Sequence, residues 1–283
     1  MRLGLFINTE KDKNMKVTGH ILRAAEKNKA GIYRIEADLE EENEINRCDA
    51  FLCVGGDGTF LRAARKIYRA GKPILGINKG SLGFLTEVEY NDIDEAIEKV
   101  VNHTYKIEER MMIEANVARN GENVFRDEAL NDFVITSGRT ARTLHLKAYM
   151  NQCYVNTYHG DGIVFATPTG STAYSMSAGG PIVQPDTKLI IMTGICQHSI
   201  SARPYIAAEN SIAKVIVDED YEKESFLSAD GSEKNFELHG GDKIEIKKSE
   251  NILNVIKLKD TDVFKVLRKK MYEREELLGK NEI

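Results

Sequence analysis

A glycine-rich turn that contains a single carboxylate, Gly55-Gly56-Asp57-Gly58-Thr59, directly follows the apolar run 50–54. Glycine has no Cβ, so backbone N–H groups in such a turn can approach an anionic ligand closely. The helix expected over 60–70 directs the positive end of its dipole at the same place. A simple phosphate cradle needs no acid, so Asp57 indicates a residue that takes a proton from a hydroxyl or holds a metal ion. The motif predicts phosphoryl transfer, while Thr59 fits a helix N-cap at least as well as a ligand contact.

A second candidate loop follows the apolar run 72–77 and extends to Glu87. It begins where a predicted strand ends, which is the edge at which α/β sheets bind ligands. Gly80 and Gly83 make this loop flexible, and Phe84 either covers a flat ring or belongs to a core between domains. Lys79 is a candidate phosphate contact, although a single loop lysine is more commonly solvated.

Three polar segments in the second half of the chain are candidates for binding a nucleotide. Asn131-Asp132 interrupts an apolar stretch, either as an Asx turn at a strand start or as a pair that hydrogen-bonds ribose hydroxyls. The segment 160–181 is so rich in small and hydroxyl-bearing residues that its backbone can approach a large, flat ligand. Asp230-Gly231 taken alone reads as a hairpin turn.

The elements that position these residues divide the chain into two parts. Up to about residue 108, apolar runs at 3–7, 50–54 and 72–77 are separated by helical patterns, which predicts a parallel α/β sheet. After it, apolar and polar residues alternate, and Asn120-Gly121 is a typical two-residue hairpin turn, so this part should be mostly antiparallel β. We expect one domain of residues 1–108 with 262–283, whose helical tail packs back on it, and a second of residues 109–261.

Composition limits the possible partners and compartment. The 283 residues are 42% hydrophobic and 29% charged, and they suit two globular domains. A net charge of −5 and a pI of about 5.8 argue against nucleic acid or membrane as the main partner. The four cysteines form no CxxC pair, which favours free thiols, and neither a signal peptide nor a membrane span is recognisable. We therefore expect a cytoplasmic protein, with structural roles for His159 and His198.

Taken together, the motifs resemble the NAD kinase family along nearly the whole chain. The family order is GGDGT, N-x-G-x-LGFLTE, an Asn-Glu pair, DG…TPTGSTAYSxSAGGPI and a late Asp-Gly. These stand here at 55–59, 78–87, 131–132, 161–182 and 230–231. The segment 194–204 also resembles the family's P-x-x-PHSLSxRP, with Arg203 and Pro204 kept and both earlier prolines replaced, by Gly194 and Gln197. Two further departures are Asp132 in place of Glu and His159 where many relatives carry Arg.

The resemblance implies a Rossmann-like α/β N-terminal domain and an all-β C-terminal β-sandwich. It also implies that ATP, or sometimes polyphosphate, phosphorylates the adenosine 2′-hydroxyl of NAD to give NADP, with Asp57 accepting the hydroxyl proton. Mg²⁺ or Mn²⁺ would be held mainly through the phosphates, which the glycine turn would bind. Chains of the family form dimers or tetramers whose sites borrow residues from a neighbour. The positions that the resemblance assigns to NAD binding are Phe84, Asn131, Asp132, Asp161 (near the nicotinamide), Thr172, Ala173, Tyr174, Ser177 and Asp230.

Three alternatives share part of this pattern. Lipid kinases share the GGDGT turn but would need a membrane-facing apolar or basic surface. The acidic composition of this chain does not indicate such a surface. Phosphofructokinases share GGDG without a counterpart of TPTGSTAY. A non-catalytic dinucleotide-binding regulator would keep the pocket and lose the chemistry, and the presence of Asp57 counts against it.

Overall fold

The computed structural model describes residues 1–7, 12, 14–35, 42–78, 83–137, 143–198, 203–218, 224–232, 234–259 and 264–270. The chain forms two compact units, residues 1–109 with 253–283 and residues 110–252. Residues 253–259, which the sequence assigned to the second domain, belong to the first unit, and Val255 near the end of a long strand pairs there in parallel with Ile74. The expectations for Lys79 and Gly80 concern residues outside those described.

The first unit is an α/β domain with a parallel sheet, as predicted. Its strands have the order β2-β1-β3-β4-β16, and the neighbouring pairs are parallel. Residues 264–270 at the end of the described chain are helical. The elements before β5 are β1 (Arg2–Ile7), α1 (Lys16–Lys27), β2 (Gly31–Ile35), α2 (Glu42–Asn46), β3 (Ala50–Val54), α3 (Asp57–Ile67), η1 (Tyr68–Ala70), β4 (Ile74–Ile77), η2 (Tyr90–Asp92) and α4 (Ile93–Val101).

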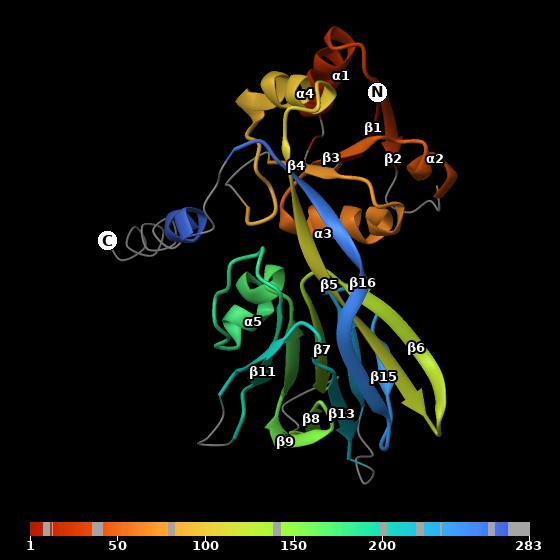
Figure 1. Cartoon of the computed structure of the whole chain (residues 1–283), viewed down its shortest axis with the longest axis vertical. Helices are drawn as coiled ribbons and strands as arrows, with labels where there is room; N and C mark the ends of the chain where they lie inside the picture. The colour runs from red at the N-terminus through yellow and green to blue at the C-terminus, as the bar shows by residue number, and fades with distance from the viewer. Residues whose placement is uncertain are drawn as a thin grey trace. The chain divides into compact units, whose positions relative to one another are not determined.

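Helices cover both faces of this parallel sheet, with α1 and α4 on one face and α3 on the other (Figure 1). Every residue of β3 is buried, which is the reason that the strand reads as a continuous apolar run. Helix α1 buries Val17, Ile21 and Ala25 on one stripe, and α4 adds Ile97 and Val100 to the same core. The buried layers fix the carboxyl ends of β3 and β4, where the candidate loops begin.

The second unit is built from antiparallel β-sheets, which also agrees with the sequence. One sheet has the order β12-β11-β10-β7-β14-β15, and the other contains β16, β13, β8 and β9 with β5 and β6. Its elements are β5 (Lys106–Arg119), β6 (Glu122–Ala129), β7 (Asp132–Ser137), β8 (Leu144–Met150), β9 (Cys153–Gly160), β10 (Gly162–Ala166), η3 (Thr169–Thr172), α5 (Tyr174–Ser177), β11 (Leu189–Ile195), β12 (Tyr205–Ala208), β13 (Ala213–Val217), β14 (Ser225–Ala229), β15 (Phe236–Leu238) and β16 (Lys243–Lys257).

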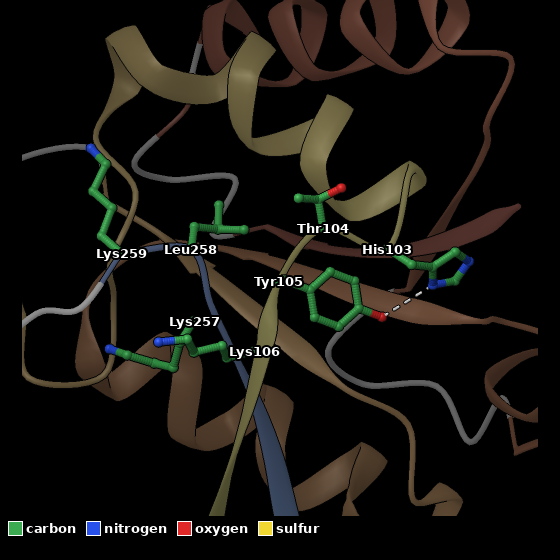
Figure 2. Close-up of a pocket in the computed structure, with 7 residues that line it drawn as sticks. All are labelled: His103, Thr104, Tyr105, Lys106, Lys257, Leu258 and Lys259. Atoms are coloured by element: carbon green, nitrogen blue, oxygen red, sulfur yellow. Dashed lines mark hydrogen bonds between the residues drawn. The ribbon is translucent and has the colours of Figure 1, made fainter.

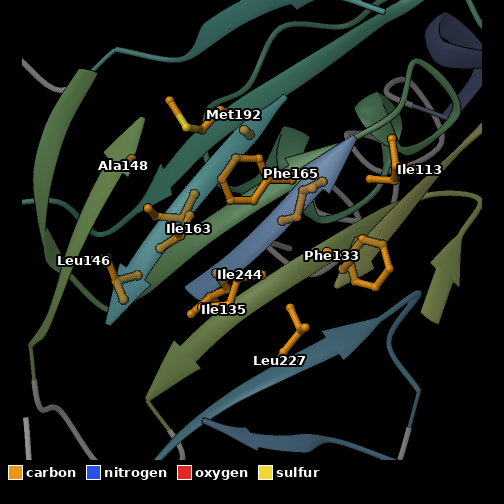
Figure 3. Packing of buried hydrophobic residues seen from close by; sticks show 14 of the residues in the cluster. Ile113, Phe133, Ile135, Leu146, Ala148, Ile163, Phe165, Met192, Leu227 and Ile244 are labelled. Carbon is orange, nitrogen blue, oxygen red and sulfur yellow. The ribbon is translucent and has the colours of Figure 1, made fainter. Parts of the chain in front are cut away.

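Alternate residues of both sheets meet in one apolar core. Phe133 of β7 and Phe165 of β10 pack with Leu146 of β8 and Ile244 of β16 between the two sheets (Figure 3). The turn Asn120-Gly121 joins β5 to β6 with φ of 53° and 87°, as the hairpin prediction requires. The packed sheets form the sandwich that the resemblance implied.

All four cysteines are free thiols. Within the described part of the chain, no helix has the length and apolar character needed to cross a bilayer.

Candidate active site

Asp57 is the first residue of helix α3, which begins three residues earlier than the sequence indicated. Gly56 occupies the N-cap position in an extended conformation (φ −96°, ψ −174°) without a side-chain cap. Thr59 therefore lies inside the first turn, and its interpretation as the N-cap is wrong. A carboxylate at this position benefits from the positive end of the helix dipole.

The Asp57 carboxylate is fixed by the loop that follows β4. Oδ2 accepts the N–H of Phe84 at 3.1 Å, and Oδ1 accepts that of Leu85 at 3.0 Å. A Cβ on Gly83 would lie 2.1 Å from Oδ1, so the carboxylate occupies the space that a side chain there would need. The Asp57 side chain nevertheless remains 32% exposed. It is thus oriented by two backbone donors and still open to a ligand.

The glycines of the turn differ in what the fold requires of them. A Cβ on Gly55 would lie 2.6 Å from the side chain of Thr59, so packing alone excludes a larger residue. A Cβ on Gly56 or Gly58 would meet no atom within 4 Å. The first N–H groups of a helix have no partner inside the helix. The space above Gly56 and Gly58 is therefore available to an anion that these N–H groups can bind.

Phe84 is half-buried beside this carboxylate, with the ammonium of Lys270 4.5 Å above its ring. The same ammonium lies 3.7 Å from Asp57 Oδ2. Sequence patterns did not indicate Lys270, because it lies more than two hundred residues away in a segment without a motif.

In the second unit, Asp230 organises the backbone at the start of β7. Its carboxylate accepts the N–H groups of Leu130, Asn131 and Asp132 at 3.0, 2.7 and 3.2 Å. Its own N–H donates to the Asp132 carbonyl at 2.9 Å. The turn residues Asp230 and Gly231 have φ of 53° and 64°. Asp230 is therefore more than a hairpin turn residue, since its carboxylate fixes the candidate Asn131–Asp132 pair.

Asp132 is buried, with only 3% of its surface exposed. Burial, and after it the charge of Asp230, raises the pKa of its carboxyl to about 7, although the N–H of Tyr174 bonds to it and acts in the opposite direction. Asp132 thus contacts the start of α5. A buried carboxyl whose pKa lies near neutrality is typical of a functional site.

The raised pKa of Asp132 predicts a pH-dependent stability. The folded state binds this proton more tightly than the unfolded state, so stability should decrease as pH rises from about 4 to about 7 and stay level above that. The full shift corresponds to roughly 4 kcal/mol. Asp132→Asn keeps an acceptor for Tyr174 without a charge, so it should be more stable than the wild type at about pH 8 and similar at about pH 4. Urea unfolding at both pH values measures this; an equal difference at both values would contradict it.

Asp161 and Tyr174 lie close to Asp132 in the same unit. The pKa of Tyr174 is raised by burial first, and then by the charges of Cys196, Asp161 and Asp132. The Cys196 thiol hydrogen-bonds to Asp161, which raises the pKa of that thiol. Cys196 is a member of this cluster that the sequence interpreted only as a free thiol.

Some of the small residues of 160–181 form hydrogen bonds that stabilise the fold, and others lie on an exposed surface. The Thr167 hydroxyl donates to the Leu130 carbonyl, and the Ser171 hydroxyl donates to the Pro168 carbonyl at 2.7 Å. A Cβ on Gly170 would lie 2.0 Å from the Asn131 carbonyl oxygen. The sequence interpretation underestimated this internal use of small side chains. The candidate residues Thr172, Ala173, Tyr174 and Ser177 are partly or fully exposed at the same turn.

His159, for which the sequence predicts a structural role, contacts another histidine. It is exposed on β9, and its ring packs edge-on against that of His145 with centroids 4.5 Å apart. Among the described residues, no group of three or more His, Cys, Asp and Glu side chains could hold a metal ion.

A separate cavity of about 390 Å³ lies in the first unit, between residues 103–106 and 257–259 (Figure 2). Two of the lysines that line it form ion pairs, Lys257 with Glu87 at 2.8 Å and Lys259 with Asp92 at 2.7 Å. None of the candidate residues named above lines this cavity. Two groups of residues remain as functional candidates. The Asp57 loop consists of Asp57 with Phe84 and Leu85, and the Asp132 cluster consists of Asp132, Asp161, Tyr174 and Cys196.

Two family models match the chain, the ATP-NAD kinase N-terminal domain over residues 5–105 and the ATP-NAD kinase C-terminal domain over residues 130–258. The NAD kinase of Ruminiclostridium cellulolyticum is 43% identical over 284 residues, covering 97% of this chain and 99% of the relative. That of Acetivibrio thermocellus is 40% identical over 287 residues, covering 98% and 99%.

Two solved structures resemble the fold. An NAD kinase from Archaeoglobus fulgidus in complex with ATP has a TM-score of 0.74 and 26% identity, covering 91% of this chain and 94% of that one. Yeast NADH kinase complexed with NADH has a TM-score of 0.80, with 95% and 86% covered; at 22% identity it supports the fold alone.

Proposed function

Because the chain belongs to the NAD kinase family of phosphotransferases, we propose that it transfers the γ-phosphoryl group of ATP to the 2′-hydroxyl of the adenosine ribose of NAD, giving NADP. Inorganic polyphosphate is the alternative donor. The observation that carries the proposal is the Asp57 carboxylate, oriented by Phe84 and Leu85 at the N-terminus of α3 and still a third exposed.

Asp57 acts as the proton acceptor in this proposal. As the new bond forms between the 2′-oxygen and phosphorus, the bond from phosphorus to the leaving diphosphate breaks, and the hydroxyl proton passes to Asp57. Phosphoryl transfer has a loose transition state, so positioning and charge neutralisation contribute most of the acceleration. The turn N–H groups at Gly56 and Gly58 would bind the phosphate oxygens.

The cluster in the second unit would bind NAD. Asn131 and Asp132 would hydrogen-bond the ribose, with Asp230 holding their backbone. The Asp161 carboxylate would complement the positive charge of the nicotinamide ring. Thr172, Ala173, Tyr174 and Ser177 would contact the adenosine, and Phe84 is a further proposed contact of NAD. The support is that Asp132, Asp161 and Tyr174 lie together and that Tyr174 is 43% exposed.

A divalent cation, Mg²⁺ or Mn²⁺, would neutralise the donor phosphates when bound. The phosphates themselves would supply most of its ligands. We further propose that the protein is cytoplasmic and forms a homodimer or homotetramer. Tyr154 of β9 and Ile206 of β12 are each 58% exposed on strands at the ends of the two sheets. A second copy would cover these edge strands.

The direct assay combines the protein with NAD, Mg²⁺ and either ATP or polyphosphate, and detects NADP with an NADP-specific dehydrogenase. We expect NADP to form with ATP. The reaction with polyphosphate shows whether the protein also accepts that phosphoryl donor. If NAD binds and neither donor yields NADP, the chain is a dinucleotide-binding regulator instead.

Gly58→Ala separates ligand binding from folding in the glycine turn. Gly58 lies in the first turn of α3 with free space around it, so alanine should stabilise the protein by about 1 kcal/mol. The same methyl would obstruct the phosphates, so we expect the KM for ATP to rise at least about tenfold, as a loss of about 1.4 kcal/mol in binding produces. Thermal unfolding and steady-state kinetics measure the two effects.

The matched control is Gly19→Ala, which replaces another helical glycine in α1. A Cβ there meets only Arg23 at an ordinary 3.4 Å. It should give a similar gain in stability with unchanged kinetics. A Gly58→Ala enzyme with wild-type kinetics would exclude phosphate binding at this turn.

A further inference from the structure

The strongest unassigned feature is the ammonium group of Lys270, which the C-terminal segment places beside the proposed reaction centre. It lies 3.7 Å from Asp57 Oδ2 and 4.5 Å above the Phe84 ring. The Lys270 side chain is 33% exposed and that of Asp57 is 32% exposed. Both charged groups therefore remain partly open to solvent and to a ligand.

The chain leading to this helix is anchored to the same loop that orients Asp57. Glu87 Oε1 accepts the N–H groups of Leu258 and Lys259 at 2.8 and 2.7 Å. Glu87 Oε2 pairs with the Lys257 ammonium at 2.8 Å, and the Glu87 side chain is only 6% exposed. Glu87 thus holds the start of the C-terminal segment. It follows closely in sequence after Phe84 and Leu85, whose N–H groups bond Asp57.

The distances suit a cation that contacts a transferred phosphoryl group. A hydroxyl that donates to Asp57 lies about 3 Å from the carboxylate, and its attacking oxygen lies about 3–3.5 Å from phosphorus before reaction. The equatorial phosphoryl oxygens would then lie within reach of a flexible lysine whose Nζ starts 3.7 Å from Asp57. Negative charge is spread over those oxygens in the transition state, where a fixed cation stabilises it most.

A purely structural role explains these contacts less well. The separation of 3.7 Å between Lys270 Nζ and Asp57 Oδ2 is long for a hydrogen bond. Exposed ion pairs and cation–π contacts each add little stability. Such a contact would give the helix 264–270 only a weak anchor.

We propose that Lys270 is a catalytic residue, whose ammonium contacts the γ-phosphoryl oxygens as the group passes from donor to acceptor beside Asp57. This rests on the proposed function. Lys270 keeps its protons throughout, while the proton released by the hydroxyl goes to Asp57. The contact is made chiefly in the transition state, so its loss should lower kcat more than it raises KM.

The test compares Lys270→Ala, Lys270→Arg and Lys269→Ala in the full-length protein. Lys269 is the exposed neighbour on the same helix and controls for loss of tail charge. We expect kcat of Lys270→Ala to fall about a hundredfold, the effect of deleting one transition-state donor. The KM for NAD and the melting temperature should stay close to wild type. Arginine should restore part of the activity, and Lys269→Ala should remain within about twofold of wild type.

A chemical rescue gives the readout that a structural role would not move. Ethylammonium added to Lys270→Ala should raise kcat several-fold, and it should leave Lys269→Ala unchanged. The proposal is overturned if Lys270→Ala keeps wild-type kcat, or if its lost activity accompanies a lowered melting temperature and ethylammonium has no effect. Wild-type protein that makes no NADP would instead refute the proposed function, so the two failures are distinguishable.

Discussion

Asp57→Asn is expected to lower kcat by about a thousandfold, within the range found when a general base is removed. The amide has nearly the shape of the carboxylate but cannot take the hydroxyl proton. NAD affinity should change little, because the residues proposed to hold NAD are mostly those of the Asp132 cluster. Steady-state kinetics give kcat, and isothermal titration calorimetry gives the NAD affinity.

The same substitution has a structural cost that must be measured separately. An asparagine offers one acceptor oxygen, so one of the N–H groups of Phe84 and Leu85 loses its partner. We expect a cost of about 1 kcal/mol in the free energy of unfolding. Asp94→Asn is the matched control, because Asp94 also lies in the first turn of a helix and is largely exposed. Comparable kcat in Asp57→Asn and wild type would eliminate the proton-acceptor role.

Asp230→Asn is expected to destabilise the second unit strongly. The carboxylate accepts three backbone N–H groups at the start of β7, and an amide nitrogen would face some of those donors. Asparagine tolerates the left-handed conformation of this residue, so backbone strain is avoided. We expect a loss of about 2–3 kcal/mol of stability and a KM for NAD raised at least about tenfold.

Asp230→Asn should also change the titration of its neighbour. The charge of Asp230 helps to raise the pKa of Asp132, so its removal should lower that pKa from about 7. NMR titration of the Asp132 carboxyl would detect the shift. Asp186→Asn controls for the loss of a charge from the second unit, since Asp186 is exposed. Unchanged stability and NAD kinetics in Asp230→Asn would show that the triple contact does not organise the site.

Features carried by local signals were predictable from the sequence. The buried run of β3, the amphipathic stripe of α4 and the hairpin at Asn120-Gly121 each depend on neighbouring residues, and each was confirmed. The first residue of α3 was harder to predict, because the N-cap is an extended glycine and has no side chain that marks the start of a helix. The domain boundary near residue 253 could not be predicted from local patterns, because one long strand, β16, contributes to both units.

Contacts between distant residues could not be read from sequence patterns. Asp230 bonds N–H groups about a hundred residues earlier, and its Asp-Gly sequence suggests only a turn. Lys270 lies in a charged tail that has no motif. Many hydroxyls of 167–175 that suggested a ligand surface instead bond within their own turn or to a neighbouring strand. In each case the fold, and not the local sequence, determines which hydrogen-bonding or charged partner lies within reach.

A crystal structure of the protein with NAD and a non-hydrolysable ATP analogue would show directly whether Asp57 faces the reacting hydroxyl. We expect the adenosine 2′-oxygen to lie within about 3.2 Å of an Asp57 carboxylate oxygen, with the γ-phosphoryl group on its other side. A complex in which that hydroxyl lies beyond hydrogen-bond reach of Asp57 and bonds another acceptor would contradict the proposed role of this carboxylate.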